Sequence, residues 1–268
     1  MMRCATAVVG LSLLCTAQSA GGLATPPVHV DATSAPLVPV DVIIESFCPC
    51  SASFEYMFAT EIAPKLGAFI ELRRWFDASA RGSQHCCDPS TEGRKTTPLP
   101  IIPKNSSLVT CFHTKLECVA NGLQRCVQAH HPAWRDWLAF SVCVNGNCTG
   151  KSDSDGCPDQ AKVGSLEHLD AEKACAAQQG FDWTTIETCW HGDQSRKLAQ
   201  ADAAHDNDVK EFYGMQGLPV VHVGGQHLSV SKFWDCNSRS AEYQARLIGA
   251  ICNATTASPK PPACAAAQ

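Results

Sequence analysis

The first part of the chain predicts two strands joined by a helix. Residues 38–47 and 68–76 are rich in β-branched and aromatic side chains, which is typical of buried strands. Between them, apolar side chains at positions 54, 57, 58 and 62 follow helical spacing, and small residues precede them as at a helix start. A strand, a helix and a second strand in this order predict a right-handed unit with parallel strands.

The rest of the chain predicts a helical stretch and then two more strands. Residues 77–108 and 144–160 contain frequent turn-forming residues and are loop-like. Residues 217–228 predict a strand, a Gly-Gly turn and a short second strand, and a last helix is predicted over 238–251. Helical patterning is also present at about 116–127, 132–142, 165–178, 183–190 and 194–206.

Length and charge limit the classes of function. The 268 residues suit one elaborated domain or two small ones, with enough chain for a substantial core. The formal net charge of −5 and the lack of a basic stripe argue against nucleic acid as a partner. No stretch reaches the ~20 apolar residues that a membrane-spanning helix needs. No membrane span is therefore predicted.

The two ends of the chain predict processing and disorder. Arg3, the apolar run after it and the small residues at 17–19 are typical of a signal peptide, predicted over residues 1–19. Residues 20–37 predict a flexible leader or pro-segment, and residues 253–268 predict a disordered tail. The folded domain is expected over 38–252, in a protein that enters the secretory pathway.

The number of cysteines agrees with entry into the secretory pathway. Two of the 17 cysteines lie in the predicted signal peptide, which leaves 15 for the mature chain and predicts a disulfide framework. Because 15 is odd, at least one thiol is expected to be free, catalytic or intermolecular. Cys264 in the tail is a candidate for the odd thiol, and it could link two chains in a disulfide-bonded dimer. Asn105, Asn147 and Asn253 stand in sequons and predict a glycosylated surface.

Cys48-Pro49-Cys50 stands where the first predicted strand ends and the first helix begins. A thiol on the first turn of a helix meets unpaired N–H groups and the positive end of the helix dipole. We therefore expect a lowered pKa for the thiol of Cys48, which favours nucleophilic attack on disulfides. The alternatives are two structural cysteines that are close by chance, or a carrier of a soft ion such as Cu(I). No metal site is predicted, because no second Cys-x-Cys, methionine-rich segment or zinc-type ligand spacing accompanies the pair.

The order of the predicted elements is similar to the thioredoxin-like arrangement, in which the active cysteines follow the first strand. In that arrangement a cis proline precedes the third strand and faces the cysteines. Leu218-Pro219 occupies this place before Val220, so it is a candidate cis proline in the substrate-binding groove. The predicted fold is α/β and thioredoxin-like, with a helical, disulfide-stapled insertion between the second and third strands, at about residues 77–210.

The segment from Cys111 to Cys126 carries the most specific pattern in the chain. It resembles C-Q-H-G-x-x-E-C-x-x-N-x-x-x-x-C, the signature of the gamma-interferon-inducible lysosomal thiol reductase family. Phe112 and Thr114 depart from that pattern, where the family has Gln and Gly. The matching residues are Cys111, His113, Glu117, Cys118, Asn121 and Cys126. The resemblance extends over roughly residues 40–252.

The resemblance implies a thiol-disulfide oxidoreductase that acts on disulfide-containing proteins. It implies no organic cofactor, since electrons come from small thiols, and it implies an acidic lysosomal or endosomal compartment; export is the other destination of such a precursor. The family's active site is C-x-x-C, whereas this chain has C-x-C. A one-residue deletion would leave Cys48 as the nucleophile and Cys50 as the resolving thiol. If the C-x-x-C spacing of the family is retained instead, Ser51 stands at the position of the second cysteine.

The altered spacing has a chemical consequence. A C-x-C disulfide closes a smaller and more strained ring, which makes it more oxidising. We therefore expect a weaker reductant that leans toward disulfide exchange or isomerisation. The alternative is a catalytically weakened or inactive, disulfide-rich secreted module with the same fold.

The signature also has a structural interpretation. On one helix, Cys118 and Cys126 would lie ~12 Å apart, too far for a mutual disulfide. Each is expected to pair elsewhere, and Glu117 and Asn121 are expected to make buried hydrogen bonds or caps. His113 could instead assist a proton transfer near the thiols. The candidate disulfide partners are Cys143, Cys148, Cys157, Cys175 and Cys189.

Overall fold

A computed structural model describes most of the predicted folded domain. Its residues are 35–46, 48–77, 85–87, 109–111, 115–146, 166–213, 218–228 and 240–265. The predicted signal peptide, most of the predicted leader, the sequons at Asn105 and Asn147, and His113 lie outside the described residues. Asn253 is described, and its side chain is exposed near the end of a helix.

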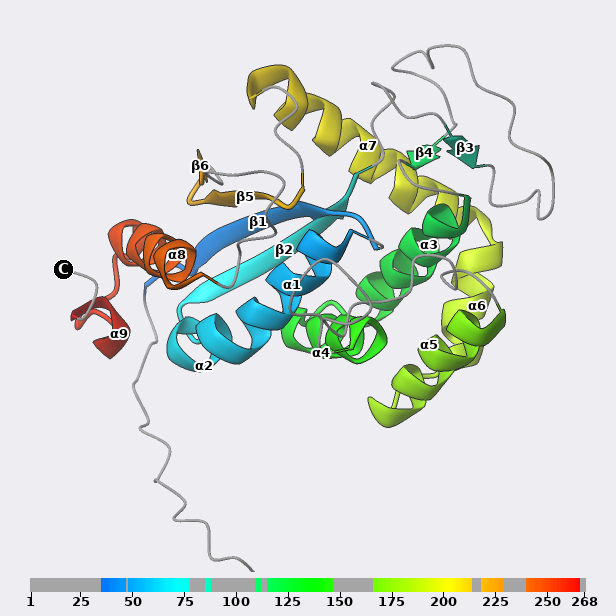
Figure 1. Cartoon of the computed structure of the whole chain (residues 1–268), viewed down its shortest axis with the longest axis horizontal. Helices are drawn as coiled ribbons and strands as arrows, with labels where there is room; N and C mark the ends of the chain where they lie inside the picture. The colour runs from blue at the N-terminus through cyan, green and yellow to red at the C-terminus, as the bar shows by residue number, and fades with distance from the viewer. Residues whose placement is uncertain are drawn as a thin grey trace, which may run out of the picture. The chain divides into compact units, whose positions relative to one another are not determined.

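The predicted strand–helix–strand unit is present at the centre of the fold (Figure 1). Strand β1 (Val38–Ile44) pairs in parallel with β2 (Ile70–Phe76). The connection is a run of helix in three parts: α1 (Pro49–Met57), a π-helical turn η1 (Phe58–Ile62) and α2 (Ala63–Leu66). The parallel pairing confirms the unit that the hydrophobic pattern predicts.

The second half of the sheet is an antiparallel hairpin. Strand β5 (Val220–Val223) runs antiparallel to β1, and β6 (Gln226–His227) pairs with β5. Gly224 and Gly225 join them with φ values of 59° and 79°, a conformation that glycine adopts without steric cost. Helix α8 (Ala241–Ala254) follows and contacts β5 and η1.

The strand order in this sheet is β2-β1-β5-β6. The first two strands are parallel, the third is antiparallel to the first, and a helix follows the hairpin. This topology is that of a thioredoxin-like α/β fold, and it confirms the predicted fold class at this level.

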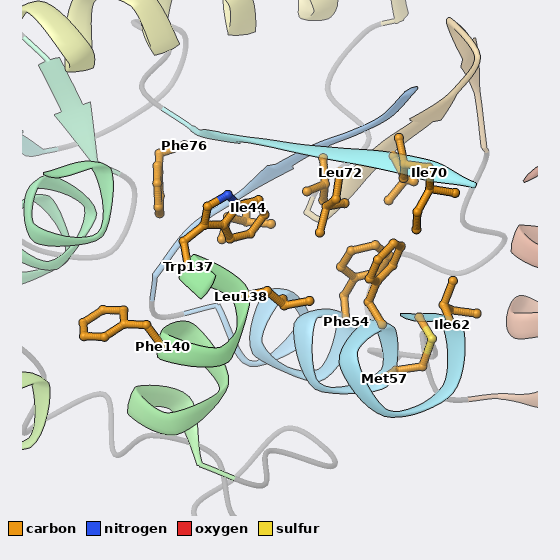
Figure 2. Close-up of a cluster of buried hydrophobic side chains, with 14 of the residues drawn as sticks. Ile44, Phe54, Met57, Ile62, Ile70, Leu72, Phe76, Trp137, Leu138 and Phe140 are labelled. Atoms are coloured by element: carbon orange, nitrogen blue, oxygen red, sulfur yellow. The ribbon is translucent and has the colours of Figure 1, made fainter. Parts of the chain in front are cut away.

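The core lies between the sheet and the first helical run. Figure 2 shows Phe54, Met57 and Ile62 of that run turned toward Ile70 and Leu72 of the sheet. Side chains from a later helix, Trp137, Leu138 and Phe140, close the other end of the cluster. All eight side chains are at most 4% exposed, so the hydrophobic effect holds α1 and η1 against β1 and β2.

Helices occupy the chain between β2 and β5. A short hairpin of β3 (His85–Cys87) and β4 (Val109–Cys111) precedes them. Cys111, the first residue of the signature, therefore lies in a strand. The helices are α3 (Lys115–His130), α4 (Trp134–Asn145), α5 (Leu166–Gln178), α6 (Trp183–His191) and α7 (Asp193–Tyr213).

Two disulfides join these helices in pairs. Cys126 of α3 is bonded to Cys189 of α6, and Cys143 of α4 is bonded to Cys175 of α5. The prediction that Cys126 pairs away from its own helix is confirmed, and Cys189 was among the predicted partners. Each bond connects helices that are separate in sequence.

The end of the chain differs from its prediction. Residues 255–265 are described, and they end in a short helix, α9 (Pro262–Ala265), in place of the disordered tail that the composition indicated. The Cys252–Cys264 disulfide explains the difference, because it ties this segment to α8 and buries Cys264. Cys264 is therefore not the odd thiol in this structure, and it is not free to link two chains.

Candidate active site

Cys48 caps the N-terminus of α1 at the end of β1. Its backbone is extended (φ −75°, ψ 114°), and its carbonyl accepts the first helical hydrogen bond, from the N–H of Ala52 at 3.0 Å. Pro49 follows at the first helical position, where its fixed φ suits a helix start and its missing N–H costs nothing. Among the cysteines whose side chains the structure describes, Cys48 has the free thiol, and it is partly exposed.

The first turn of α1 lies beside the sulfur of Cys48. The N–H groups of Cys50 and Ser51 and the hydroxyl of Ser51 are near enough to lower the pKa of the thiol, although the side chain of Cys48 makes no capping hydrogen bond. Ser51 is 1% exposed, and its oxygen accepts from the N–H of Glu45 at 3.3 Å. The side chain of Ser51 is therefore held in place at the start of α1.

Cys50 is in a different chemical state from Cys48. It is disulfide-bonded, and because Cys48 is free, the two sulfurs are not bonded to each other. The predicted resolving thiol is thus oxidised in this structure. The same fact weighs against a Cu(I) carrier, since such a site would need two thiolates here. The described residues contain no group of three or more side chains suited to hold a metal ion.

Burial raises the pKa of the Cys48 thiol above its ordinary value. The nearby carboxylate of Glu117 acts in the same direction, and the donors on Ser51 and Cys50 lower the pKa without outweighing burial. The sequence-based expectation of a lowered pKa was wrong. It considered the helix N-terminus but not the packing of α1 against the rest of the fold, which limits the access of water to the partly exposed Cys48.

Two signature residues support the turn that leads to Cys48. Asn121 and Glu117 lie on α3 and are both 0% exposed. The side-chain oxygen of Asn121 accepts from the backbone N–H of Ser46 at 3.0 Å and from its hydroxyl at 2.5 Å. The amide nitrogen of Asn121 donates to Glu117 at 3.3 Å. These are the buried hydrogen bonds that the signature predicted, and they reach the residue two positions before the thiol.

The other signature residues take different places. Cys126 is in the disulfide to Cys189, and Cys118 lies on α3 with its side chain outside the described part of the structure. The proposed proton-transfer role of His113 falls on a residue outside the described ranges and stays a prediction. The described part of the signature therefore serves as a support for the active-site turn.

The chain matches a known family over this same segment. The family model of gamma interferon inducible lysosomal thiol reductase (GILT) matches residues 100–161. The match includes α3, with Glu117 and Asn121, and it does not include Cys48 or Cys50.

The other comparisons give more distant similarities or none. A comparison with curated proteins finds no match. The reduced form of a disulfide bond oxidoreductase from Mycobacterium tuberculosis is 14% identical, over 86% of this chain and 82% of that chain, with a TM-score of 0.41. A protein-disulfide isomerase from Novosphingobium aromaticivorans is also 14% identical, over 79% of this chain and 93% of that chain, with a TM-score of 0.39.

Leu218 and Pro219 lie at the same end of the sheet as the thiol. The peptide bond between them is cis, and Pro219 is buried immediately before β5. The register pairs Val220 of β5 with Ile43 of β1, so Pro219 lies beside the strand end that leads to Cys48. Their role in substrate binding remains a prediction.

A buried ion pair behind the site was missed by the sequence reasoning. Arg74 of β2 and Glu55 of α1 are 1% and 2% exposed, and the Nη1 atom of Arg74 donates to Glu55 at 2.9 Å. Gln124 of α3 accepts from the same nitrogen at 3.0 Å. The period-2 pattern of β2 could have revealed it, because Arg74 lies on the same face of the strand as the buried Leu72 and Phe76. The pair links the helix that carries Cys48 to the sheet and to the signature helix.

The environment of Cys48 gives a pH prediction. Because the pKa of its thiol is raised, alkylation by iodoacetamide should be slow at pH 7 and should still increase above pH 9. Replacing Glu117 with Gln removes a negative charge beside the sulfur, which lowers the pKa of Cys48. We expect alkylation at pH 7 to become several-fold faster, with the whole profile shifted to lower pH.

The matched control for this prediction is Glu242→Gln. Glu242 is an exposed carboxylate in the first turn of α8, so the same change of charge should leave the alkylation profile of Cys48 unchanged. A Glu117→Gln profile that coincides with wild type, in a variant with unchanged thermal unfolding, would show that this carboxylate does not set the pKa of the thiol.

Proposed function

We propose that this protein is a member of the GILT family and a thiol-disulfide oxidoreductase in which Cys48 attacks disulfides of protein substrates. The observation that carries the proposal is the state of Cys48. It is a free, partly exposed thiol at the N-terminus of α1, beside the N–H groups of the first helical turn. The other cysteines whose side chains the structure describes are all oxidised.

The first step is a thiol-disulfide exchange. The thiolate of Cys48 attacks one sulfur of the substrate disulfide, a bond forms between these two sulfurs, and the substrate S–S bond breaks. The second substrate sulfur leaves as a thiolate and takes up a proton. The donors of Ser51 and Cys50 stabilise the negative charge on the sulfur of Cys48 before attack.

A second thiol must then release the substrate from Cys48. The sequence prediction assigns this step to Cys50, which would attack Cys48 and close a strained C-x-C disulfide. In this structure Cys50 is already oxidised, so that route requires its present disulfide to open first. A small external thiol can perform the same step, and it is the reductant that we propose. No organic cofactor is needed for either step.

The proposal extends to location and to the helical segment. We propose residues 1–19 as a signal peptide and a lysosomal, endosomal or secreted destination, in keeping with the name of the matching family. We also propose that the helices between β2 and β5 are an insertion into the thioredoxin-like core, stapled by disulfides. Its contribution to the site is α3, which supports the turn before Cys48 through Asn121. Within the described residues, no helix is both long and apolar enough to cross a membrane.

An insulin-reduction assay with a small thiol as the electron source tests this function. We expect Cys48→Ser to reduce the rate to that of the small thiol alone, while wild type accelerates the reaction. Because the pKa of Cys48 is raised, the wild-type rate should be higher at pH 7 than at pH 4.5, since less thiolate is present in acid. Thermal unfolding of Cys48→Ser controls for a loss of fold.

The alternative is a catalytically weakened or inactive module that retains the fold. The raised pKa of Cys48 and the oxidised state of Cys50 are the observations that favour it. The same assay separates the two functions. A wild-type rate equal to the background, with Cys48 shown to be reduced and open to alkylation, would contradict the oxidoreductase proposal and support the structural module.

A further inference from the structure

The residue that faces the thiol of Cys48 is a serine. Ser51 is three positions after Cys48, and residues three apart lie on the same side of a helix. Cys48 is the N-cap of α1 and Ser51 is its third residue, the position toward which an N-cap side chain is directed. The N–H and the hydroxyl of Ser51 are near enough to the sulfur to lower the pKa of the thiol. The oxygen of Ser51 accepts from the N–H of Glu45, and its side chain is 1% exposed, so it is held at this position.

The second cysteine of the motif has a different place. Cys50 is two positions after Cys48, and side chains two apart on a helix do not face each other. The backbone N–H of Cys50 lies near the sulfur of Cys48 and lowers the pKa of that thiol. The sulfur of Cys50 is itself bonded to another cysteine. The geometry of the helix start, and not closeness in sequence, determines which side chain meets the thiol.

We propose that Cys48 is a single-thiol exchange centre in which Ser51 takes the place of the second thiol. This inference rests on the proposed function and specifies how its second step occurs. It also decides between the two explanations of the C-x-C motif. The spacing of the site is retained, its fourth position is Ser51, and Cys50 belongs to a separate disulfide.

The chemistry of the second step follows from this arrangement. A hydroxyl does not displace a thiolate from a disulfide, so the bond between Cys48 and the substrate persists until an external thiol arrives. A small thiol attacks the sulfur of the substrate, the bond to Cys48 breaks, and Cys48 leaves as a thiolate that takes up a proton. The substrate keeps the small thiol as a mixed disulfide, and a second small thiol removes it to give the oxidised dimer of the small thiol.

The single-thiol centre therefore favours a particular class of substrate. A mixed disulfide between a protein and a small thiol needs only one attack by Cys48. Cys48 attacks the sulfur of the small thiol and forms a disulfide with it, and the protein leaves in its reduced form. A second small thiol then attacks this disulfide and regenerates Cys48. No resolving cysteine takes part in this cycle.

Glutathione disulfide is a suitable probe for the test. Wild type, Ser51→Cys and Ser53→Cys are incubated with it, freed of excess reagent, and followed by intact mass and peptide mapping. Wild type should hold one glutathione on Cys48 for the length of the experiment. Ser51→Cys should lose it, because the new thiol attacks Cys48 and closes a disulfide between positions 48 and 51. That variant should also reduce insulin faster than wild type.

Ser53→Cys is the matched control, because Ser53 is an equally buried serine on the same helix, five positions after Cys48. It should keep the adduct as wild type does. Loss of glutathione from wild type with formation of a Cys48–Cys50 disulfide would overturn the inference, and so would a Ser51→Cys variant that keeps its adduct. No adduct on wild-type Cys48, with the thiol open to iodoacetamide, would instead contradict the proposed function itself.

Discussion

Replacing Arg74 with methionine should lower the free energy of unfolding by about 3–5 kcal/mol, because it leaves the Glu55 carboxylate buried without its charge partner. Both side chains are at most 2% exposed, so water cannot replace the lost interaction. Arg74 also lies over the rings of Phe76 and Trp137, at 4.8 and 4.4 Å from their centroids. Methionine retains part of this packing, so the charge accounts for most of the expected loss. Urea denaturation measures it.

The neighbouring arginine provides the control. Arg73 has 47% of its side chain exposed, and it pairs with Glu71, which has 49% exposed. Arg73→Met should therefore cost only about 0–1 kcal/mol, as expected for a surface ion pair screened by water. An Arg74→Met variant that loses no more stability than Arg73→Met would contradict the role given to the buried pair.

The loss in Arg74→Met should depend on pH. Burial already raises the pKa of Glu55, and Arg74 is the main influence that lowers it. Without Arg74, the pKa of Glu55 in the folded state rises further above its unfolded value. A group with a raised folded pKa binds its proton more tightly in the folded state, so the folded state gains stability as pH falls. The destabilisation should thus be smaller at pH 5 than at pH 8.

Removing the Cys126–Cys189 disulfide should cost about 4 kcal/mol, the value that chain entropy gives for a closed loop of this size. The two cysteines are 63 residues apart and are buried between α3 and α6. Replacing both with alanine frees α3 from one of its attachments. Thermal unfolding of the double variant measures the loss of stability.

The disulfide should also affect the thiol of Cys48, because α3 carries Asn121 and Glu117. When α3 loosens, the hydrogen bonds from Ser46 to Asn121 should weaken, and alkylation of Cys48 should become faster. The Cys252–Cys264 disulfide provides the comparison, since its cysteines are 12 residues apart and lie in α8 and α9. Its removal should cost about 3 kcal/mol and leave alkylation of Cys48 unchanged. Equal alkylation in both double variants would contradict the support that α3 gives to the site.

The predicted elements depend on local patterns, and for that reason most of them agree with the structure. The alternation of β-branched residues is sufficient to predict β1 and β2. The Gly-Gly pair is sufficient to predict the turn between β5 and β6. The order of these elements leaves few topologies open, because a strand–helix–strand connection is almost always right-handed. The signature segment likewise indicated the family whose model matches residues 100–161, since its residues stand at fixed spacing.

The state of the site depends on neighbours that are distant in sequence. Burial of α1 sets the direction of the pKa of Cys48, and this burial comes from strands and helices far along the chain. Arg74 meets Glu55 and Gln124 only after β2, α1 and α3 pack together. The pairing of Cys264 with Cys252, and the oxidised state of Cys50, are likewise absent from any local pattern.

The sequence therefore determines that a thiol stands at the start of a helix at the end of β1, since strand and helix patterns are local. It does not determine the direction in which the pKa of that thiol shifts. That direction depends on solvent exclusion and on the charge of Glu117, which is distant in sequence. Both influences arise only when the whole domain has folded, because desolvation and charge interactions act through space and not along the chain.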